Sequence, residues 1–232
     1  MEKHGHFLFI LITTFLVSSV MAQNNLIGPL IGLNLANIDV DIKEGEQQID
    51  TGMRTGFAFG GMFYWSFTSN IGIQCEPVYT QKGAKANVKW TENGTNIDMD
   101  QTFKTNYIDI PVLLKASFGQ KNAKPYVIAG PYIGLRTGDA MVDIDRVSVN
   151  GQDITSQVPS DEREVELDTK STDFGINIGA GFLFSLTTNY LFIEGQYSMG
   201  LTNINAEEDN DANTLKTKGI QIRIGLLFSL GG

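Results

Sequence analysis

DFGINIGAGFLFSL, the stretch from Asp173 to Leu186, alternates large apolar side chains with small or polar ones. A strand of a soluble sandwich puts its apolar face in a core and carries Lys, Glu or Thr on its solvent face. Glycine and asparagine are poor residues for such a solvent face. The stretch fits a closed barrel in a membrane better, with apolar side chains toward lipid and small or polar ones inside.

The same two-residue alternation, bounded by turn residues, recurs along the chain and predicts eight strands. These strands span residues 29–37, 55–67, 70–82, 105–118, 124–136, 173–186, 190–203 and 220–230. The last is the most regular, because its even-numbered residues from Ile220 to Leu230 are all large and apolar.

The third and fifth strands are the least regular. Pro77 lies within the third strand, where a proline removes one ladder donor. The fifth strand carries apolar residues on both faces, and we assign the face of Tyr126, Ile128 and Tyr132 to the interior. That assignment puts Val127 toward lipid.

The connections between these strands alternate between long and short. Long segments follow the odd-numbered strands, at residues 38–54, 83–104, 137–172 and 204–217, and short ones follow the others, at 68–69, 119–123 and 187–189. Outer-membrane barrels have short periplasmic turns and long outer loops. The sequence therefore predicts an all-β fold, an eight-stranded antiparallel up-and-down transmembrane β-barrel with short periplasmic turns, four long outer loops and both chain ends in the periplasm.

The amino terminus, MEKHGHFLFILITTFLVSSVMAQ, has the features of a secretory signal peptide. Lys3 lies in a short polar head, an apolar run covers residues 7–20, and small residues lead up to Ala22. A spanning helix is the alternative, but the apolar run is shorter than the roughly 20 residues that a span needs. We expect residues 1–22 to be removed and residues 23–232 to form a single barrel domain in the outer membrane of a Gram-negative bacterium.

The composition narrows the range of functions. A formal net charge of −9 argues against nucleic acid as a partner, and the carboxylates gather at residues 161–168 and 207–211, which we interpret as solvated loop surface. The two histidines, His4 and His6, belong to the expected signal peptide, and Cys75 is the one cysteine. Because Ser-His-Asp catalysis and most metal sites need histidine, we expect no catalytic residue, no cofactor and no metal site, and hence no enzyme.

Five charged residues fall on the predicted inner faces: Glu76, Asp109, Lys115, Glu194 and Arg223. Charges kept from water need partners. Because the strands concerned are neighbours, we expect Glu194 to pair with Arg223 and Glu76 with Lys115. The interior of a barrel of about eight strands is nearly filled by side chains. We therefore interpret the five residues as a structural network and not as a proton or substrate path.

Several short stretches together resemble the PorT-like outer-membrane β-barrel family of Bacteroidetes-type bacteria. They are GLNLANI (32–38), YTQKGAK (79–85), YIDIPVLLK (107–115), KPYVIAGPYIGL (124–135), DFGINIGAGF (173–182) and YSMGLTNI (197–204), in the order that this family uses. The resemblance implies an outer-membrane barrel. The founding members look like accessory factors of a dedicated protein-secretion system, whereas many relatives have no assigned role.

The leading hypothesis is a noncatalytic outer-membrane component, structural or accessory to secretion or assembly, that acts through its outer loops or protein partners. Its expected partners are membrane lipid and other envelope or secretion proteins, while the sequence specifies no small-molecule ligand. A surface receptor or adhesin that binds through residues 83–104 and 137–172 is the alternative. A soluble lipocalin-like barrel is less favoured, because its Gly, Asn and Gln face would meet water. An outer-membrane enzyme is disfavoured by the missing histidine.

Overall fold

The computed structural model describes residues 25–41, 48–119, 122–206 and 214–230. These residues form one sheet of 13 strands and two short 3-10 helices. The expected signal peptide and the acidic stretch at 207–211 lie outside the described residues. Within the part of the chain that the structure describes, no helix is long and apolar enough to cross a membrane.

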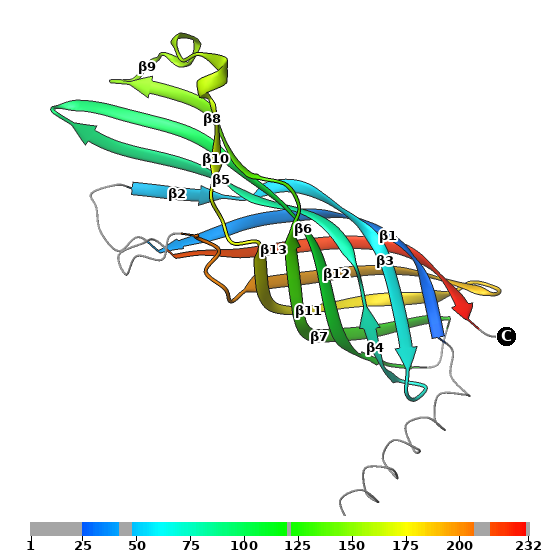
Figure 1. Ribbon diagram of the computed structural model, residues 1–232. Helices are drawn as coiled ribbons and strands as arrows, with labels where there is room; N and C mark the ends of the chain where they lie inside the picture. Colours follow the sequence, from blue (N-terminus) through cyan, green and yellow to red (C-terminus); the bar gives the residue numbers. More distant parts are fainter. Residues whose placement is uncertain (1–24, 42–47, 120–121, 207–213, 231–232) are drawn as a thin grey trace, which may run out of the picture.

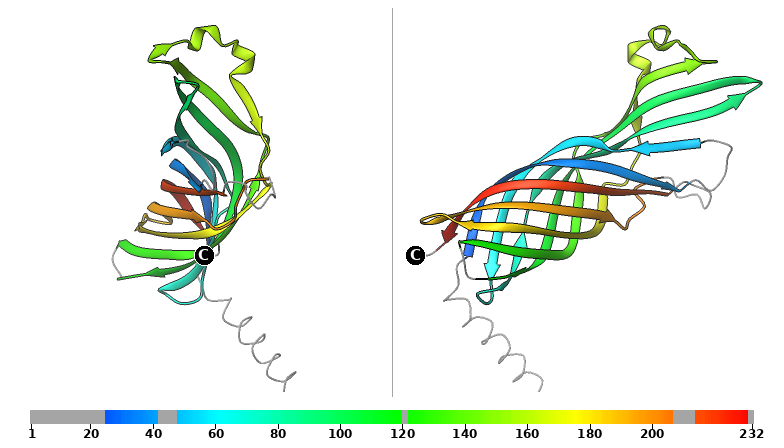
Figure 2. Two further views of the ribbon diagram at one scale, coloured as in Figure 1. Left: turned by 90° about the vertical axis from the view of Figure 1, so that its left-hand side faces the viewer. Right: turned by 180° about the vertical axis from the view of Figure 1, so that it is seen from behind.

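The strands close into a ring of eight positions, which is seen from two sides in Figures 1 and 2. In ring order these are β1 (Asn25–Asp41), β3 (Arg54–Ser66), β4 (Ile71–Cys75) with β5 (Val78–Glu92), β6 (Thr95–Ser117), β7 (Ala123–Arg136), β11 (Thr172–Ser185), β12 (Asn189–Gly200) and β13 (Thr214–Leu230). Every neighbouring pair is antiparallel, and β13 pairs back with β1 along its whole length. The predicted fold class is therefore confirmed.

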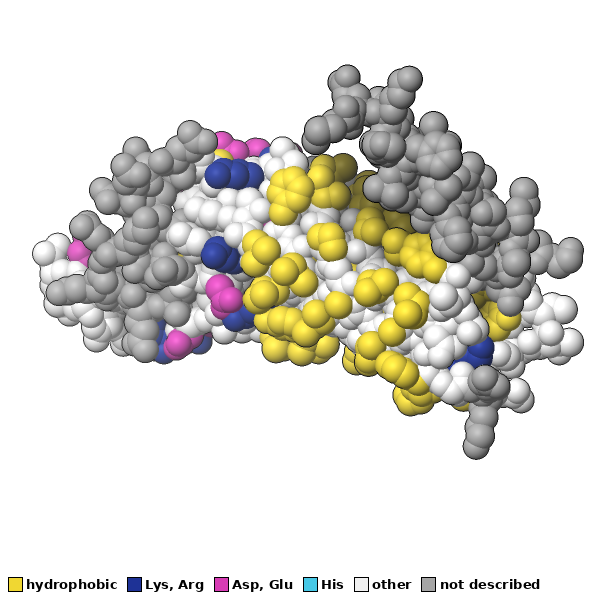
Figure 3. Space-filling model, turned by 90° about the horizontal axis from the view of Figure 1, so that it is seen from below, with side chains coloured by type: hydrophobic (Ala, Val, Ile, Leu, Met, Phe, Trp, Pro, Cys, Tyr) yellow, Lys and Arg dark blue, Asp and Glu magenta, His cyan; other side chains and the backbone are white. Residues whose placement is uncertain are grey.

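The wall of the barrel is apolar outside and largely polar inside. In β7, Tyr126, Ile128 and Tyr132 are buried, whereas Val127 and Leu135 are 47% and 42% exposed, which confirms the inner face assigned to this strand. Figure 3 shows apolar side chains over the middle of the barrel wall, with Lys, Arg, Asp and Glu toward one end. A soluble ligand carrier needs the reverse arrangement.

Pro77 splits the third predicted strand into β4 and β5. The ladder bends around this break because backbone bonds continue on both sides: the Glu76 N–H donates to the Pro111 carbonyl at 3.2 Å, and the Gly61 N–H donates to the Pro77 carbonyl at 3.1 Å. The ring position is thus filled by two strands in line.

The long connections, expected as loops, are built largely of further strands. The β5–β6 hairpin continues to a two-residue turn at Asn93 and Gly94, whose φ angles are 50° and 79°. Positive φ at both positions is what the tightest hairpin turn requires, and Asn-Gly supplies it at low cost. The strands therefore run on where the sequence analysis placed a loop from residue 83 to residue 104.

We call the part of the sheet beyond the barrel rim the extension. It contains the far halves of β5 and β6 together with β2 (Gln48–Gly52), β8 (Ala140–Val149), β9 (Gln152–Asp153) and β10 (Glu164–Leu167), followed in space by the 3-10 helices η2 (Thr155–Gln157) and η3 (Ser160–Glu162). Above the end of β7, β6 pairs with β8 instead. Figure 1 shows β5, β6 and β8 leaving the barrel side by side.

A bulge marks the place where the extension leaves the ring. Ala58 lies opposite Thr80, but six residues earlier Gly52 lies opposite Lys85, so β2 and β3 hold one residue more than the facing part of β5. The side chain of Gln81 completes the ladder there by accepting the Phe57 N–H at 3.1 Å. Bulges of this kind bend a strand and redirect its side chains.

Candidate functional site

The interior is filled in successive layers, and the first is apolar. At the short-turn end, Leu26, Met62, Phe192 and Leu227 pack together with eight further buried side chains. Phe192 and Leu227 have no solvent exposure. This layer seals the barrel at the end where both chain termini lie.

The second layer is a charged cluster that we call the central network. It consists of Gln74, Glu76, Lys115, Glu194, Gln196 and Arg223, each at most 2% exposed. Two cations and two carboxylates balance each other in charge. The two glutamines supply the remaining hydrogen bonds that buried carboxylates need.

Arg223 is the centre of this network. It lies directly opposite Glu194 in the β12–β13 ladder and forms an ion pair with it, as the sequence indicated. The same Nη2 atom reaches across the interior to Oε2 of Glu76 at 2.8 Å. One guanidinium therefore holds two carboxylates that would otherwise repel each other.

The two glutamines connect the carboxylates. Nε2 of Gln74 donates to Glu76 at 2.6 Å and to Glu194 at 3.0 Å. Nε2 of Gln196 donates to Glu194 at 3.0 Å and to Glu76 at 3.3 Å. Four strands are thereby tied together across the interior.

The expected pair of Glu76 and Lys115 does not form. The β4–β6 register puts Lys115 opposite Gly72, four residues away from Glu76. Its Nζ atom donates instead to Oε1 of Gln74 at 3.0 Å and lies 3.6 Å from the ring centroid of Tyr126, a cation–π arrangement.

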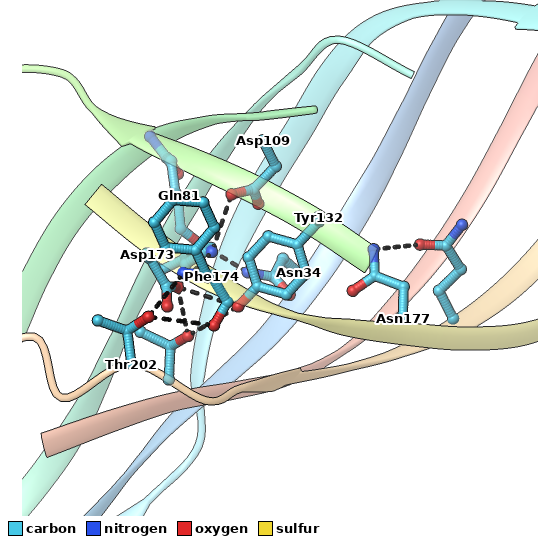
Figure 4. Close-up of polar contacts among 11 residues, drawn as sticks. Asn34, Gln81, Asp109, Tyr132, Asp173, Phe174, Asn177 and Thr202 are labelled. Carbon is cyan, nitrogen blue, oxygen red and sulfur yellow. Dashed lines mark hydrogen bonds and ion pairs between the residues drawn. The ribbon is translucent and has the colours of Figure 1, made fainter. Parts of the chain in front are cut away.

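The third layer, which we call the outer cluster, consists of Lys82, Asp109, Tyr132, Asp173 and Thr217. Nζ of Lys82 lies 2.9 Å from Oδ1 of Asp109 and 3.1 Å from Oδ2 of Asp173. The hydroxyls of Tyr132 and Thr217 donate to the same Asp173 oxygen at 3.0 and 2.7 Å. Figure 4 shows Asp109, Tyr132 and Asp173 converging inside the barrel.

The sequence analysis placed Asp109 inside but missed its partners Lys82 and Asp173. Both positions follow from the alternation itself: Lys82 shares its face with Thr80, and Asp173 shares its face with Gly175. Each lies at the end of a predicted strand. Continuing the two-residue period by one step would have found them.

The layers leave no visible route along the axis among the described residues. On β13 alone, Leu227, Arg223 and Thr217 belong in turn to the apolar layer, the central network and the outer cluster. Asp173 is completely buried, so solvent and solute do not reach its carboxylate. The arrangement can tie strands together, but it presents no accessible acid, base or nucleophile.

Comparison with solved structures gives three outer-membrane proteins of low identity. Neisserial surface protein A is 14% identical over 88% of this chain and 97% of its own, with a TM-score of 0.44. OprG from Pseudomonas aeruginosa is 13% identical over 90% and 97%, with a TM-score of 0.46. Ail, the attachment invasion locus protein of Yersinia pestis, is 12% identical over 89% and 100%, with a TM-score of 0.36.

No curated protein sequence matches this chain. The model of one family, described as "Outer membrane protein beta-barrel domain", matches residues 21–206, which is most of the chain. That match agrees with the closed ring, the apolar outer wall and the polar interior. The chain therefore belongs to the outer membrane protein β-barrel domain family, whose location is the outer membrane of Gram-negative bacteria.

Proposed function

We propose that the protein is a noncatalytic outer-membrane anchor that holds its extension outside the cell for contact with another envelope or secretion protein. The extension carries this proposal. β6 has 23 residues, about twice the 9–11 that a tilted membrane strand needs. The surplus is paired on both sides, with β5 and with β8, and forms an ordered sheet beyond the membrane.

Two further observations support an anchor. The interior is occupied by the apolar layer, the central network and the outer cluster, which suits a barrel that carries a load better than one that conducts. The PorT-like resemblance of six short stretches suits an accessory role in secretion, since the founding members of that family look like secretion factors. The long-connection end is taken to face outward, as in other outer-membrane barrels.

Glu194→Ala is expected to lower the stability of the barrel without altering its permeability. The change leaves Arg223 with Glu76 alone but does not remove the apolar layer or the outer cluster. Stability is measured by urea unfolding of the refolded protein, and permeability is measured as conductance in planar bilayers. A large rise in conductance would contradict the structural interpretation of the central network and favour a gated path.

Shortening the hairpin tests the role of the extension. Asn87 and Asp100 are cross-strand partners, so deleting residues 88–92 and 95–99 lets Asn93 and Gly94 close the turn directly between them. The shortened protein is expected to keep the heat-dependent gel shift of a folded barrel. It is also expected to run alone on native gels of outer membranes from the parent bacterium, where the full-length protein runs as a larger assembly.

Thr68→Ala serves as the control at the opposite end. The Thr68 hydroxyl accepts the backbone N–H groups of Asn70 and Ile71 in the β3–β4 turn, at 3.2 and 3.0 Å. Its loss costs about 1 kcal/mol of stability but leaves the assembly intact. The proposed function fails if the full-length protein runs alone, or if the shortened protein keeps the assembly.

A further inference from the structure

The interior at the base of the extension holds an apolar cavity of about 410 Å³. Six of its lining residues come from five strands: Ile38, Phe103, Val142, Ile144, Leu167 and Leu215. Thr51 and Gln101 are the polar residues among those that line it, and no charged residue does. The cavity belongs neither to the lipid-facing wall nor to the charged layers below it.

The cavity lies on the inner face, just beyond the outer cluster. On β5, Ala84 lines the cavity two residues after Lys82, and on β13, Leu215 lines it two residues before Thr217. Side chains two residues apart on a strand share a face. The outer cluster is therefore the floor of the cavity, and access is from the long-connection end.

A water-accessible apolar recess of this kind is unusual in the absence of an occupant. Ile38, Ala84, Phe103 and Ala140 form a buried cluster at its base, and partly buried aliphatic side chains surround them. Exposed apolar surface held in a concave, polar-rimmed place marks interaction sites. The two undescribed segments beside it, IKEGEQ (42–47) and EEDNDAN (207–213), contain a single large apolar residue, Ile42, so the chain supplies little of its own to fill it.

We propose that this cavity binds a neutral hydrophobic small molecule from the cell exterior. Its volume falls within the roughly 300–1,000 Å³ of small-molecule sites and is too small for a helix of a partner protein. A charged headgroup inside it would lose water and find no counter-ion in the lining. Because the outer cluster closes the floor, the ligand enters and leaves by the same opening, so the cavity holds it and does not conduct it.

Phenylnaphthylamine, an uncharged probe that fluoresces in apolar surroundings, tests the site with the full-length mature protein in lipid nanodiscs. Ala86→Phe places a ring in the cavity, because Ala86 lines it, and Ile144→Phe does the same from β8. Ala129→Phe is the matched control, since Ala129 lies on the exposed outer face of β7. The heat-dependent gel shift verifies that each variant is folded.

The wild-type protein and Ala129→Phe are expected to bind the probe saturably, and both filled variants to bind it about tenfold more weakly or less, because the added ring takes the space that the probe needs. Anilinonaphthalene sulfonate, of similar size but anionic, is expected to show no difference between wild type and filled variants. Equal titration of phenylnaphthylamine by wild type and the folded filled variants overturns the proposal. An equal loss in Ala129→Phe also overturns it, as does filling-sensitive binding of the anionic probe.

Discussion

Arg223→Gln is expected to destabilise the barrel by about 3–5 kcal/mol, the typical result of removing one partner from a buried ionic cluster. The Arg223 side chain is 1% exposed and is paired with both Glu76 and Glu194. Without it, two buried carboxylates face each other with Lys115 as the remaining cation of the central network. The measurement is the urea midpoint of unfolding in liposomes, followed by tryptophan fluorescence and by gel shift.

Arg146→Gln is the matched control, because it makes the same chemical change in the extension. Arg146 is half exposed and lies 3.5 Å from Asp100, so its loss should cost less than about 1 kcal/mol. Converting Glu76 and Glu194 to glutamine as well should restore much of the stability lost in Arg223→Gln, since no uncompensated carboxylate then remains. If Arg223→Gln and Arg146→Gln unfold at the same urea concentration, the central network does not stabilise the barrel.

Gly28→Ala is expected to prevent closure of the barrel. Gly28 lies where β1 meets β13, and a Cβ atom there would overlap the carbonyl oxygen and carbon of Leu226. Those atoms belong to backbone, which cannot turn aside as a flexible side chain can. The cost should exceed the usual overpacking penalty of about 1–3 kcal/mol, and the heat-modifiable folded form should be absent after refolding.

Gly195→Ala is the control for this substitution. Gly195 lies in β12 with nothing within 4 Å of the position of its missing Cβ. The added methyl group therefore meets open space, and the variant should refold as the wild type does. A normally folded Gly28→Ala protein would show that the β1–β13 seam has more room than the structure gives it.

The two-residue period predicted the ring and the side of the wall on which each residue lies. Lipid and interior impose opposite demands on successive residues, so the signal is strong in every spanning strand. Register between strands joined by a short turn was also within reach, which is why Glu194 was matched with Arg223. The contact of Arg223 with Glu76 was not, because it crosses the interior and depends on the curvature and stagger of the whole barrel.

The extension was missed for a different reason. Its strands are polar on one face and only moderately apolar on the other, so the contrast that marks a membrane strand fades beyond Lys82. The Asn93-Gly94 pair was nevertheless visible in the sequence and is a strong hairpin signal. In a chain whose barrel strands are found first, this turn would have indicated that β5 and β6 continue well past the membrane.

The β5–β6 ladder runs in constant register from Val78 opposite Asp109 to Glu92 opposite Thr95, with no bulge between the membrane and the tip. Mechanically, these two strands form a single lever. Lys82 and Asp109 ride on that lever, whereas Asp173 belongs to β11, which has no part in the extension. A sideways pull on the tip therefore loads the contact between Lys82 and Asp173 first, and this ion pair is the fulcrum at which movement outside the cell would be felt within the membrane.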